Sequence, residues 1–211
     1  IGGARRALEL LGITPALYIS VELDTACALL VKNAWPEVVL LEDVGGLTES
    51  VLADLLGTTP SLDTGLVVGG APCQPFSGLN KKRGGWGDPR SGGITLFAQL
   101  IANLRKAAPQ IQWHSMLENV ASMPDSDRST ITQELVKVYP TKPYWIDAAV
   151  LSQVRRPRLY WPSWKLVAGE LNQMDSGKGY VHVINPSPER IPVGEFLDPG
   201  VTKCGDRPFP T

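Results

Sequence analysis

The sequence is poor in the residues that build disulfide frameworks, metal centres and membrane spans. It has only 3 cysteines and 2 histidines in 211 residues, and no two cysteines have the CxxC spacing. This scarcity argues against a disulfide scaffold and a zinc site, and it suits free thiols in a reducing compartment. No apolar run reaches the roughly 18 residues of a membrane span, and the first residues lack the layout of a secretion signal.

An excess of one charge is also absent. Lysine and arginine total 20, aspartate and glutamate total 21, and the formal net charge is −1. A neutral chain does not attract nucleic acid through its overall field, although it can still gather basic residues in one loop or cleft. The hydrophobic share of 43% and the length of 211 residues suffice for one globular domain with a packed core.

Strand-like and helix-like segments alternate along the chain up to Pro162. The predicted strands cover 17–21, 38–41, 65–70, 113–117, 144–151 and 159–161, and the predicted helices cover 4–11, 25–32, 49–56, 96–106 and 129–138. This alternation predicts an α/β fold with a doubly wound, mostly parallel sheet and helices on both faces. After Pro162 the chain is rich in proline and glycine, and few regular elements are expected.

Polar residues follow four of the predicted strands. They are Glu22, the pair Glu42-Asp43, Cys73 and Glu118. Because ligands of an open α/β sheet collect at the carboxyl ends of its strands, we expect these residues to face one crevice.

Cys73 is the candidate nucleophile. A lone cysteine is more often a small core residue, but Cys73 lies in the segment Ala71-Pro72-Cys73-Gln74-Pro75-Phe76-Ser77. The two prolines make this turn rigid, and Gly69-Gly70 before it let the backbone pass close to a ligand.

Two further motifs follow in the chain, Leu117-Glu118-Asn119-Val120 and Arg156-Pro157-Arg158-Leu159-Tyr160. Taken alone, each is compatible with solvated surface charge. Together with the cysteine motif they resemble the cytosine carbon-5 methyltransferase family, which has PCQ, ENV and RxR motifs in this order. The similarity covers most of residues 1–161 and is greatest to the eukaryotic de novo DNA methyltransferases, through Tyr18–Glu22, Glu118–Met123 and Ile146–Ser152.

The resemblance implies a Rossmann-like fold that depends on S-adenosylmethionine and transfers a methyl group to carbon 5 of cytosine in DNA. Cys73 would attack carbon 6 of a base flipped out of the duplex. Glu118, protonated or sharing a proton with ring nitrogen 3, would stabilise the charge that develops on the ring. Arg156 and Arg158 would hold the base carbonyl, the intermediate or a phosphate, and they would favour the thiolate.

The resemblance also assigns binding residues. Glu22 would meet the cofactor ribose, and Asp43 the adenine amino group, with Leu23 and Val44 against the ring. The other cofactor residues implied are Gly2, Gly3, Pro72 and Leu96. The glycine-rich stretch 78–93 resembles the mobile catalytic loop of the family, and the residues that would contact DNA are Ser77, Lys81, Lys82, Arg83 and Arg90. No metal is implied.

Some elements of the family lie outside this chain. Its first strand is expected before Ile1, and the elements that close the sheet and the cofactor pocket are expected after Thr211. We therefore predict an incomplete fold in which residues 1–161 are a catalytic core without its first strand and 162–211 are a short region resembling the target-recognition part. Alone, such a chain is expected to be weakly active or inactive, and other methyltransferase subunits are candidate partners beside DNA.

Two alternatives remain open. A tRNA cytosine methyltransferase would share the scaffold, but its Cys-Phe-Thr tripeptide is not found in this chain. An inactive or regulatory relative would bind DNA or a partner without chemistry, which the intact Cys73, Glu118 and Arg158 argue against. A DNA enzyme of this kind is expected in the nucleus of a eukaryote, or otherwise inside the cell.

Overall fold

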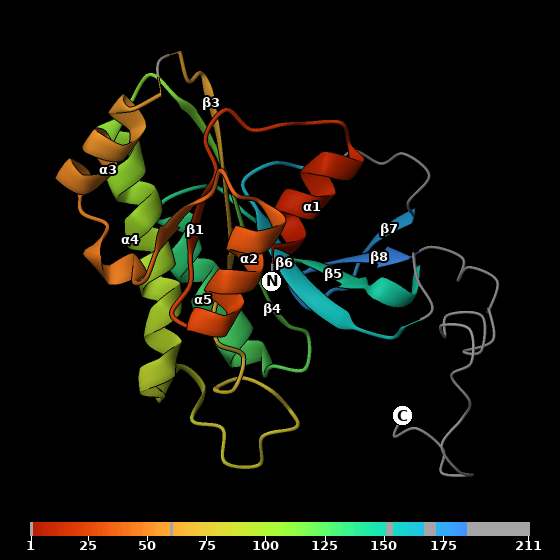
Figure 1. Ribbon diagram of the computed structural model, residues 1–211. Helices are drawn as coiled ribbons and strands as arrows, with labels where there is room; N and C mark the ends of the chain where they lie inside the picture. Colours follow the sequence, from red (N-terminus) through yellow and green to blue (C-terminus); the bar gives the residue numbers. More distant parts are fainter. Residues whose placement is uncertain (1, 60, 151–153, 167–171, 185–211) are drawn as a thin grey trace, which may run out of the picture.

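The strands form two separate sheets in a computed structural model that describes residues 2–59, 61–150, 154–166 and 172–184 (Figure 1). The smaller sheet pairs β1 (Ile19–Val21) with β2 (Val39–Leu41) in parallel. The larger sheet has the strand order β3-β4-β6-β5-β8-β7. Its strands are β3 (Thr64–Gly70), β4 (Gln112–Val120), β5 (Tyr144–Asp147), β6 (Pro157–Pro162), β7 (Asn172–Asp175) and β8 (Val181–Ile184).

The pairing confirms an α/β fold with a mostly parallel sheet. β3 is parallel to β4 and β5 is parallel to β8, whereas β6 is antiparallel to both β4 and β5, and β7 is antiparallel to β8. Four of the six strands of the larger sheet therefore run in one direction. Among the described residues β1 pairs only with β2 and β3 is paired only with β4, so the strands form two sheets.

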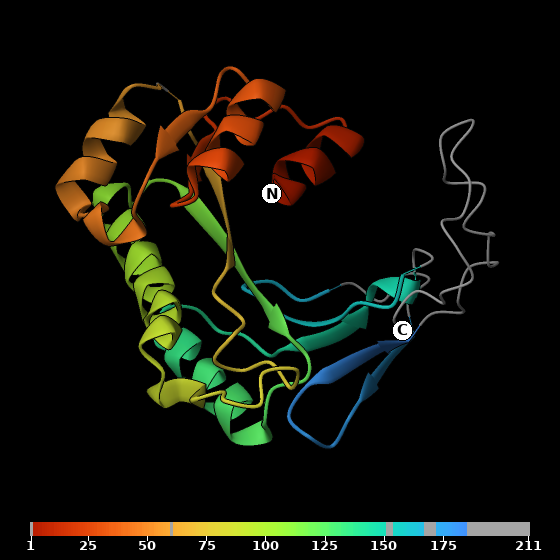
Figure 2. The same cartoon turned by 60° about the horizontal axis from the view of Figure 1, so that its bottom comes forward.

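The described residues contain five α-helices, of which the first precedes β1 and the other four connect strands: α1 (Gly3–Leu10), α2 (Thr25–Ala34), α3 (Glu49–Gly57), α4 (Gly92–Ala107) and α5 (Asp125–Val136). Side-chain caps fix two of the starts, because Asp24 accepts a hydrogen bond from the Cys27 amide and Thr48 accepts one from the Val51 amide. Figure 2 shows α3, α4 and α5 side by side along one flank of β3 and β4, and α1 and α2 lie next to the smaller sheet. No helix of the described residues is long and apolar enough to cross a membrane.

The main core lies between α4, α5 and the larger sheet. It contains the fully buried residues Phe76, Ile94, Ile101, Leu117, Ile131, Leu135 and Trp161. Trp161 also donates a hydrogen bond from its indole nitrogen to the Thr132 hydroxyl at 2.9 Å. Gly69 is needed here for close packing, since a Cβ at that position would come within 2.6 Å of the Phe97 ring.

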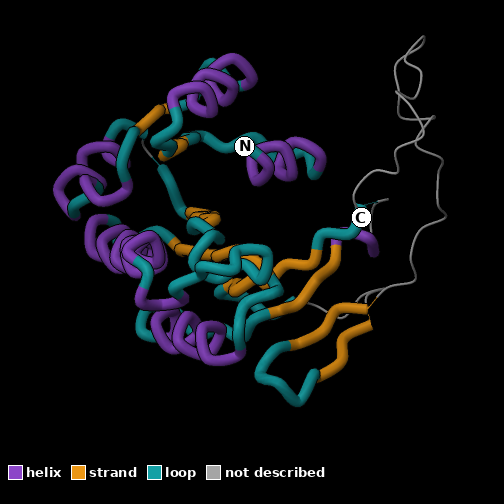
Figure 3. The backbone as a smooth tube through the Cα atoms, turned by 90° about the horizontal axis from the view of Figure 1, so that it is seen from below, coloured by secondary structure: helices purple, strands orange, loops and turns teal. Residues whose placement is uncertain are grey.

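The structure differs from the sequence prediction near the end of the described residues. The strand predicted over 144–151 ends at Asp147, and a 3₁₀ turn, Ala148–Val150, follows; the rest of the predicted strand lies outside the described residues. Beyond Pro162, β7 and β8 form a hairpin that extends the sheet from β5 (Figure 3). Its strands escaped prediction because Asn172–Asp175 is mostly polar and exposed. The division of the chain near residue 161 stays a prediction.

Candidate active site

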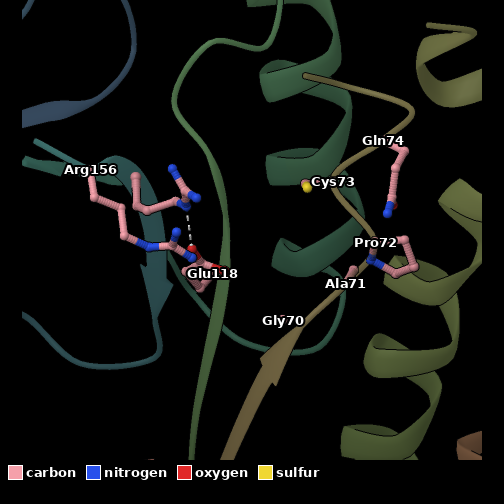
Figure 4. A pocket seen from close by; sticks show the side chains of 8 residues that line it. Gly70, Ala71, Pro72, Cys73, Gln74, Glu118 and Arg156 are labelled. Atoms are coloured by element: carbon pink, nitrogen blue, oxygen red, sulfur yellow. Dashed lines mark ion pairs between the residues drawn. The ribbon is translucent and has the colours of Figure 1, made fainter. Parts of the chain in front are cut away.

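The Cys73 loop leaves the carboxyl end of β3 and forms one wall of a cavity of about 370 Å³. The cavity is lined by Gly70, Ala71, Pro72, Cys73, Gln74, Glu118, Arg156 and Arg158. Figure 4 shows Cys73 on one side of this cavity, with Glu118 and Arg156 on the other. The structure therefore brings together the four residues that the sequence predicted for catalysis, from β4, from the loop after β3, and from β6 and the residue before it.

A tight turn holds the Cys73 loop in place. The Cys73 carbonyl oxygen accepts hydrogen bonds from the amides of Phe76 at 3.0 Å and Ser77 at 2.9 Å. The Phe76 side chain, fully buried in the core, anchors this turn. Asn119, which is 1% exposed, donates from its side-chain amide to the Ala71 carbonyl at 3.3 Å and so ties β4 to the loop. The thiol of Cys73 is free and half-buried.

Glu118 and Arg158 form an ion pair in the cavity wall. The Arg158 Nε atom lies 2.7 Å from Glu118 Oε1, and the side chains are 17% and 29% exposed. The sheet register explains why these two side chains meet. β4 lies between β3 and β6, and Glu118 pairs with Gly70 on one side and with Tyr160 on the other. Arg158 is two residues from Tyr160 on β6 and therefore lies on the same face as Glu118. A charged hydrogen bond in a partly buried position fixes the direction of the carboxylate.

Two residues that the sequence did not nominate belong to this site. Tyr160 lies opposite Glu118 on β6, and burial, followed by the negative charge of Glu118, raises the pKa of its phenol. Asn119 holds the loop as described above. Asn119 is directly beside the nominated Glu118 and therefore points to the opposite face of β4. Tyr160 is two residues from Arg158 and shares its face, but its place opposite Glu118 depends on the observed register.

The basic loop between β3 and α4 has two distinct parts. In its outer part, Lys81, Lys82 and Arg83 are exposed, and Ser77 is half-buried at its start. Its second part runs through the 3₁₀ turns η2 (Gly85–Gly87) and η3 (Pro89–Ser91).

This second part is anchored to the rest of the fold. The Gly85 amide donates to the Pro75 carbonyl at 2.9 Å, and the Trp86 amide donates to Asp127 of α5 at 3.1 Å. Arg90 differs from the other three cations, because its guanidinium donates to the Asp88 carboxylate at 2.9 and 2.7 Å. To contact DNA as predicted, the Arg90 guanidinium would have to leave the Asp88 carboxylate.

The predicted cofactor residues lie mainly at the carboxyl end of the smaller sheet. Glu22 follows β1, and Asp43 follows β2 and caps the 3₁₀ turn η1 (Val44–Gly46) by accepting from the Gly45 amide at 2.9 Å. Leu23 is 77% exposed, whereas Val44 packs against a small cluster that contains Leu47. None of these predicted cofactor residues lines the Cys73 cavity.

The remaining predicted cofactor residues have separate surroundings. Gly2 has a φ of 63°, and a Cβ there would come within 2.3 Å of the Trp35 ring. Backbone conformation and packing therefore both require glycine at this position, independently of a cofactor. Gly3 begins α1. Pro72 lines the cavity, and Leu96 is 40% exposed on α4. No group of three histidine, cysteine, aspartate or glutamate side chains that could hold a metal ion occurs in the described part of the chain.

Comparison with known proteins identifies the family of this chain. The family model described as C-5 cytosine-specific DNA methylase matches residues 1–153. The type II methyltransferase M.AquIA of Picosynechococcus sp. is 33% identical over 106 residues, which are 50% of this chain and 40% of that protein. The chain thus belongs to the C-5 cytosine-specific DNA methylase family.

Solved structures show that the fold is shared. Entamoeba histolytica methyltransferase EhMeth matches with a TM-score of 0.61 and 16% identity, over 95% of this chain and 58% of that one. Spodoptera frugiperda DNMT2, as a triple mutant, matches with a TM-score of 0.55 and 21% identity, over 77% and 46%. The chain spans less than two thirds of each of these relatives. Its similarity to the eukaryotic de novo branch stays a prediction.

Proposed function

We propose that the protein transfers a methyl group to carbon 5 of cytosine in DNA, with Cys73 as the nucleophile. The observation that carries the proposal is the cavity in which Cys73, Glu118, Arg156 and Arg158 meet from three separate segments. Family membership supports the reaction class. In a eukaryotic host, a DNA substrate would place the enzyme in the nucleus.

The residues of the cavity match the chemistry that cytosine requires, because carbon 5 is a poor nucleophile until carbon 6 is attacked. The Cys73 thiolate forms a bond to carbon 6, and the electron pair of the 5,6 double bond makes carbon 5 an enamine nucleophile. S-adenosylmethionine, when bound, supplies the methyl group. Loss of the carbon-5 proton then re-forms the double bond and expels the Cys73 thiolate.

Glu118 and Arg158 stabilise the charge that accompanies this attack. The carboxyl group of Glu118 faces ring nitrogen 3 and exchanges a proton with it, while Arg158 holds that carboxyl group at 2.7 Å. Arg156, on the same side of the cavity, holds the base carbonyl or a nearby phosphate. A base stacked in a duplex cannot reach Cys73, so it must be flipped out.

The residues at the end of the smaller sheet fit the adenosine part of S-adenosylmethionine. Carboxylates at the ends of two adjacent parallel strands, Glu22 and Asp43, suit the ribose hydroxyls and the adenine amino group. The exposed Leu23 beside Glu22 offers an apolar surface for the adenine ring. The exposed Lys81, Lys82 and Arg83 are suited to DNA phosphates.

The open surroundings of the predicted cofactor residues favour one alternative. Leu10, Leu29 and Leu30, on the two helices beside the smaller sheet, are 74%, 62% and 58% exposed. A chain in this state would bind cofactor weakly, as expected for an inactive form. Another methyltransferase subunit that covers this surface is the proposed partner.

The test is covalent trapping on DNA that contains 5-fluorocytosine, with S-adenosylmethionine present. Fluorine at carbon 5 cannot leave as a proton, so the Cys73 adduct persists through denaturation. The expected result is an adduct with the wild-type protein that disappears in Cys73→Ala, a loss of at least about 10⁴-fold. A fluorinated tRNA serves as the parallel substrate. An adduct that forms with tRNA and not with DNA would show that tRNA is the substrate. If no adduct forms with either nucleic acid, the inactive alternative is supported.

A further inference from the structure

Asp147 is the single buried carboxylate among the described residues, and the proposed reaction gives it no role. It ends β5 and is 7% exposed. Burying a carboxylate is costly unless hydrogen bonds and charges compensate it, so its partners indicate what it does.

The partners of Asp147 lie on the segment that leads into β6. One oxygen, Oδ1, accepts from the Arg156 amide at 2.7 Å and from the Ala149 amide at 3.1 Å. The other oxygen, Oδ2, lies 3.6 Å from Nε of Arg155, a side chain that is 82% exposed. Burial acts to raise the pKa of Asp147, but the two amides and the Arg155 charge together hold it below its usual value.

The β5–β6 ladder shows why a side chain acts at this position. Asp147 pairs with Pro157, and the next pair along the ladder would join Ala148 to Arg156. The Ala148 amide does donate to the Arg156 carbonyl, at 3.3 Å. Ala148 begins a 3₁₀ turn, however, and the Arg156 amide donates to the Asp147 carboxylate. The carboxylate thus takes the place that a backbone carbonyl has in a continued antiparallel ladder.

We propose that Asp147 is a positioning residue that fixes the backbone of Arg156 and thereby aims Arg156 into the Cys73 cavity. Because residues two apart on a strand share a face, the same constraint sets the side of the sheet on which Arg158 meets Glu118. This inference rests on the proposed function, since it assigns a role toward the same nucleophile.

Three variants separate the hydrogen bonds from the charge. Asp147→Asn keeps an oxygen at the Oδ1 position, where both amides bind, and should retain most of the adduct rate. Asp147→Leu has similar bulk but no acceptor, and it should slow adduct formation on 5-fluorocytosine DNA by about 10-fold to 100-fold through misplacement of Arg156. Arg155→Gln removes only the exposed ion pair and should stay within about twofold. The proposal would be overturned if Asp147→Asn formed the adduct as slowly as Asp147→Leu. It would also be overturned if Arg155→Gln lowered the rate of adduct formation as much as Asp147→Leu does.

A double-mutant cycle tests whether Asp147 acts through Arg156. In an Arg156→Ala background, Asp147→Leu should cost little further rate, because the side chain that it aims is already absent. A loss that is fully additive would instead indicate general damage to the fold. Thermal unfolding of each variant accompanies the cycle.

Hydrogen exchange at the Arg156 amide gives a readout that needs no activity. The amide should be protected in the wild type and in Asp147→Asn, and it should exchange at least about tenfold faster in Asp147→Leu. Equal exchange in wild type and Asp147→Leu would refute the inference even if the protein forms no adduct. An absent adduct with the expected exchange pattern would instead count against the proposed function alone.

Discussion

The two sheets of the molecule differ in how completely their residues are packed. In the larger sheet, Leu117, Leu159 and Trp161 are 0%, 1% and 0% exposed, and helices cover them. In the smaller sheet every strand residue is partly exposed, and Leu23 beside it is 77% exposed. The predicted nucleophile and its charged partners thus lie on a rigid framework, whereas most of the predicted cofactor residues lie on an open one. Addition to the base and binding of the methyl donor should respond separately to mutation.

The largest expected effect is on the packed side. Glu118→Gln removes the charge that Arg158 holds and the acid that the reaction needs, so the rate of methyl transfer should fall on the order of 10²-fold to 10⁴-fold. Single-turnover assays on DNA with saturating S-adenosylmethionine measure this rate. Circular dichroism should show an unchanged fold. A loss smaller than about tenfold would remove Glu118 from the proposed mechanism.

A matched pair of leucines compares the two sheets directly. Leu117→Ala opens a cavity in the core and should lower the free energy of unfolding by about 2–5 kcal/mol. Leu23→Ala makes the same change on an exposed side chain and should alter it by less than about 0.5 kcal/mol. Denaturant unfolding gives both values. If the two losses are alike, the smaller sheet is better packed in solution than its exposure indicates.

A smaller effect is expected for the cofactor side. Glu22→Ala removes the acceptor proposed for the ribose hydroxyls, so the Kd for S-adenosylmethionine should rise by about tenfold. Isothermal titration calorimetry measures this change. Cys73 addition to cytosine in the absence of cofactor is the control, since it draws only on the other sheet. Parallel losses in both measurements would show that the two sides are coupled.

The smallest effect concerns pH and the anchored part of the basic loop. The hydrogen bond from the Arg90 side chain, followed by that from the Arg90 amide, lowers the pKa of Asp88 to about 2. Because the folded pKa lies below the ordinary value, the ion pair supports the loop above about pH 4. That support is lost as the pH falls toward 2. Carboxyl titration by NMR should find a midpoint well below that of an exposed aspartate, and Arg90→Gln should return it toward the ordinary value.

Three motifs in the sequence nominated the acidic, basic and nucleophilic residues of the site. Cys73 and Glu118 required only the knowledge that parallel strands end at one edge, whereas Arg158 lies at the start of the antiparallel strand β6 and came from the family resemblance. The role of Tyr160 required the exact pairing of β4 with β6, and periodicity along a single strand does not give pairing partners. The role of Asp147 was overlooked for a related reason, since it binds Arg156 through the backbone amide, a contact that the residue types do not indicate.

The fold was predicted less evenly. Helices and buried parallel strands have strong periodic patterns, and their positions agree to within a few residues over most of the chain. The hairpin of β7 and β8 has polar strand residues, and its turn depends on Gly177 and Gly179 at φ values of 66° and 81°. The sequence analysis predicted an incomplete sheet from the family resemblance, but which strands lie at the break could not be predicted, because the residues of a strand do not specify its neighbours.

The anchor at Gly85 limits how far the basic loop can act. The Gly85 amide is bound to the Pro75 carbonyl at 2.9 Å, so both ends of the outer part start from one point. A closed loop extends from its base by at most half its contour length, which for residues 77–84 is about 14 Å. Lys81, Lys82 and Arg83 are therefore carried on a backbone tether whose length is close to the roughly 12 Å width of a major groove. In the proposed complex with DNA, the backbone of this loop would reach across one groove from the Cys73 cavity and not to the next.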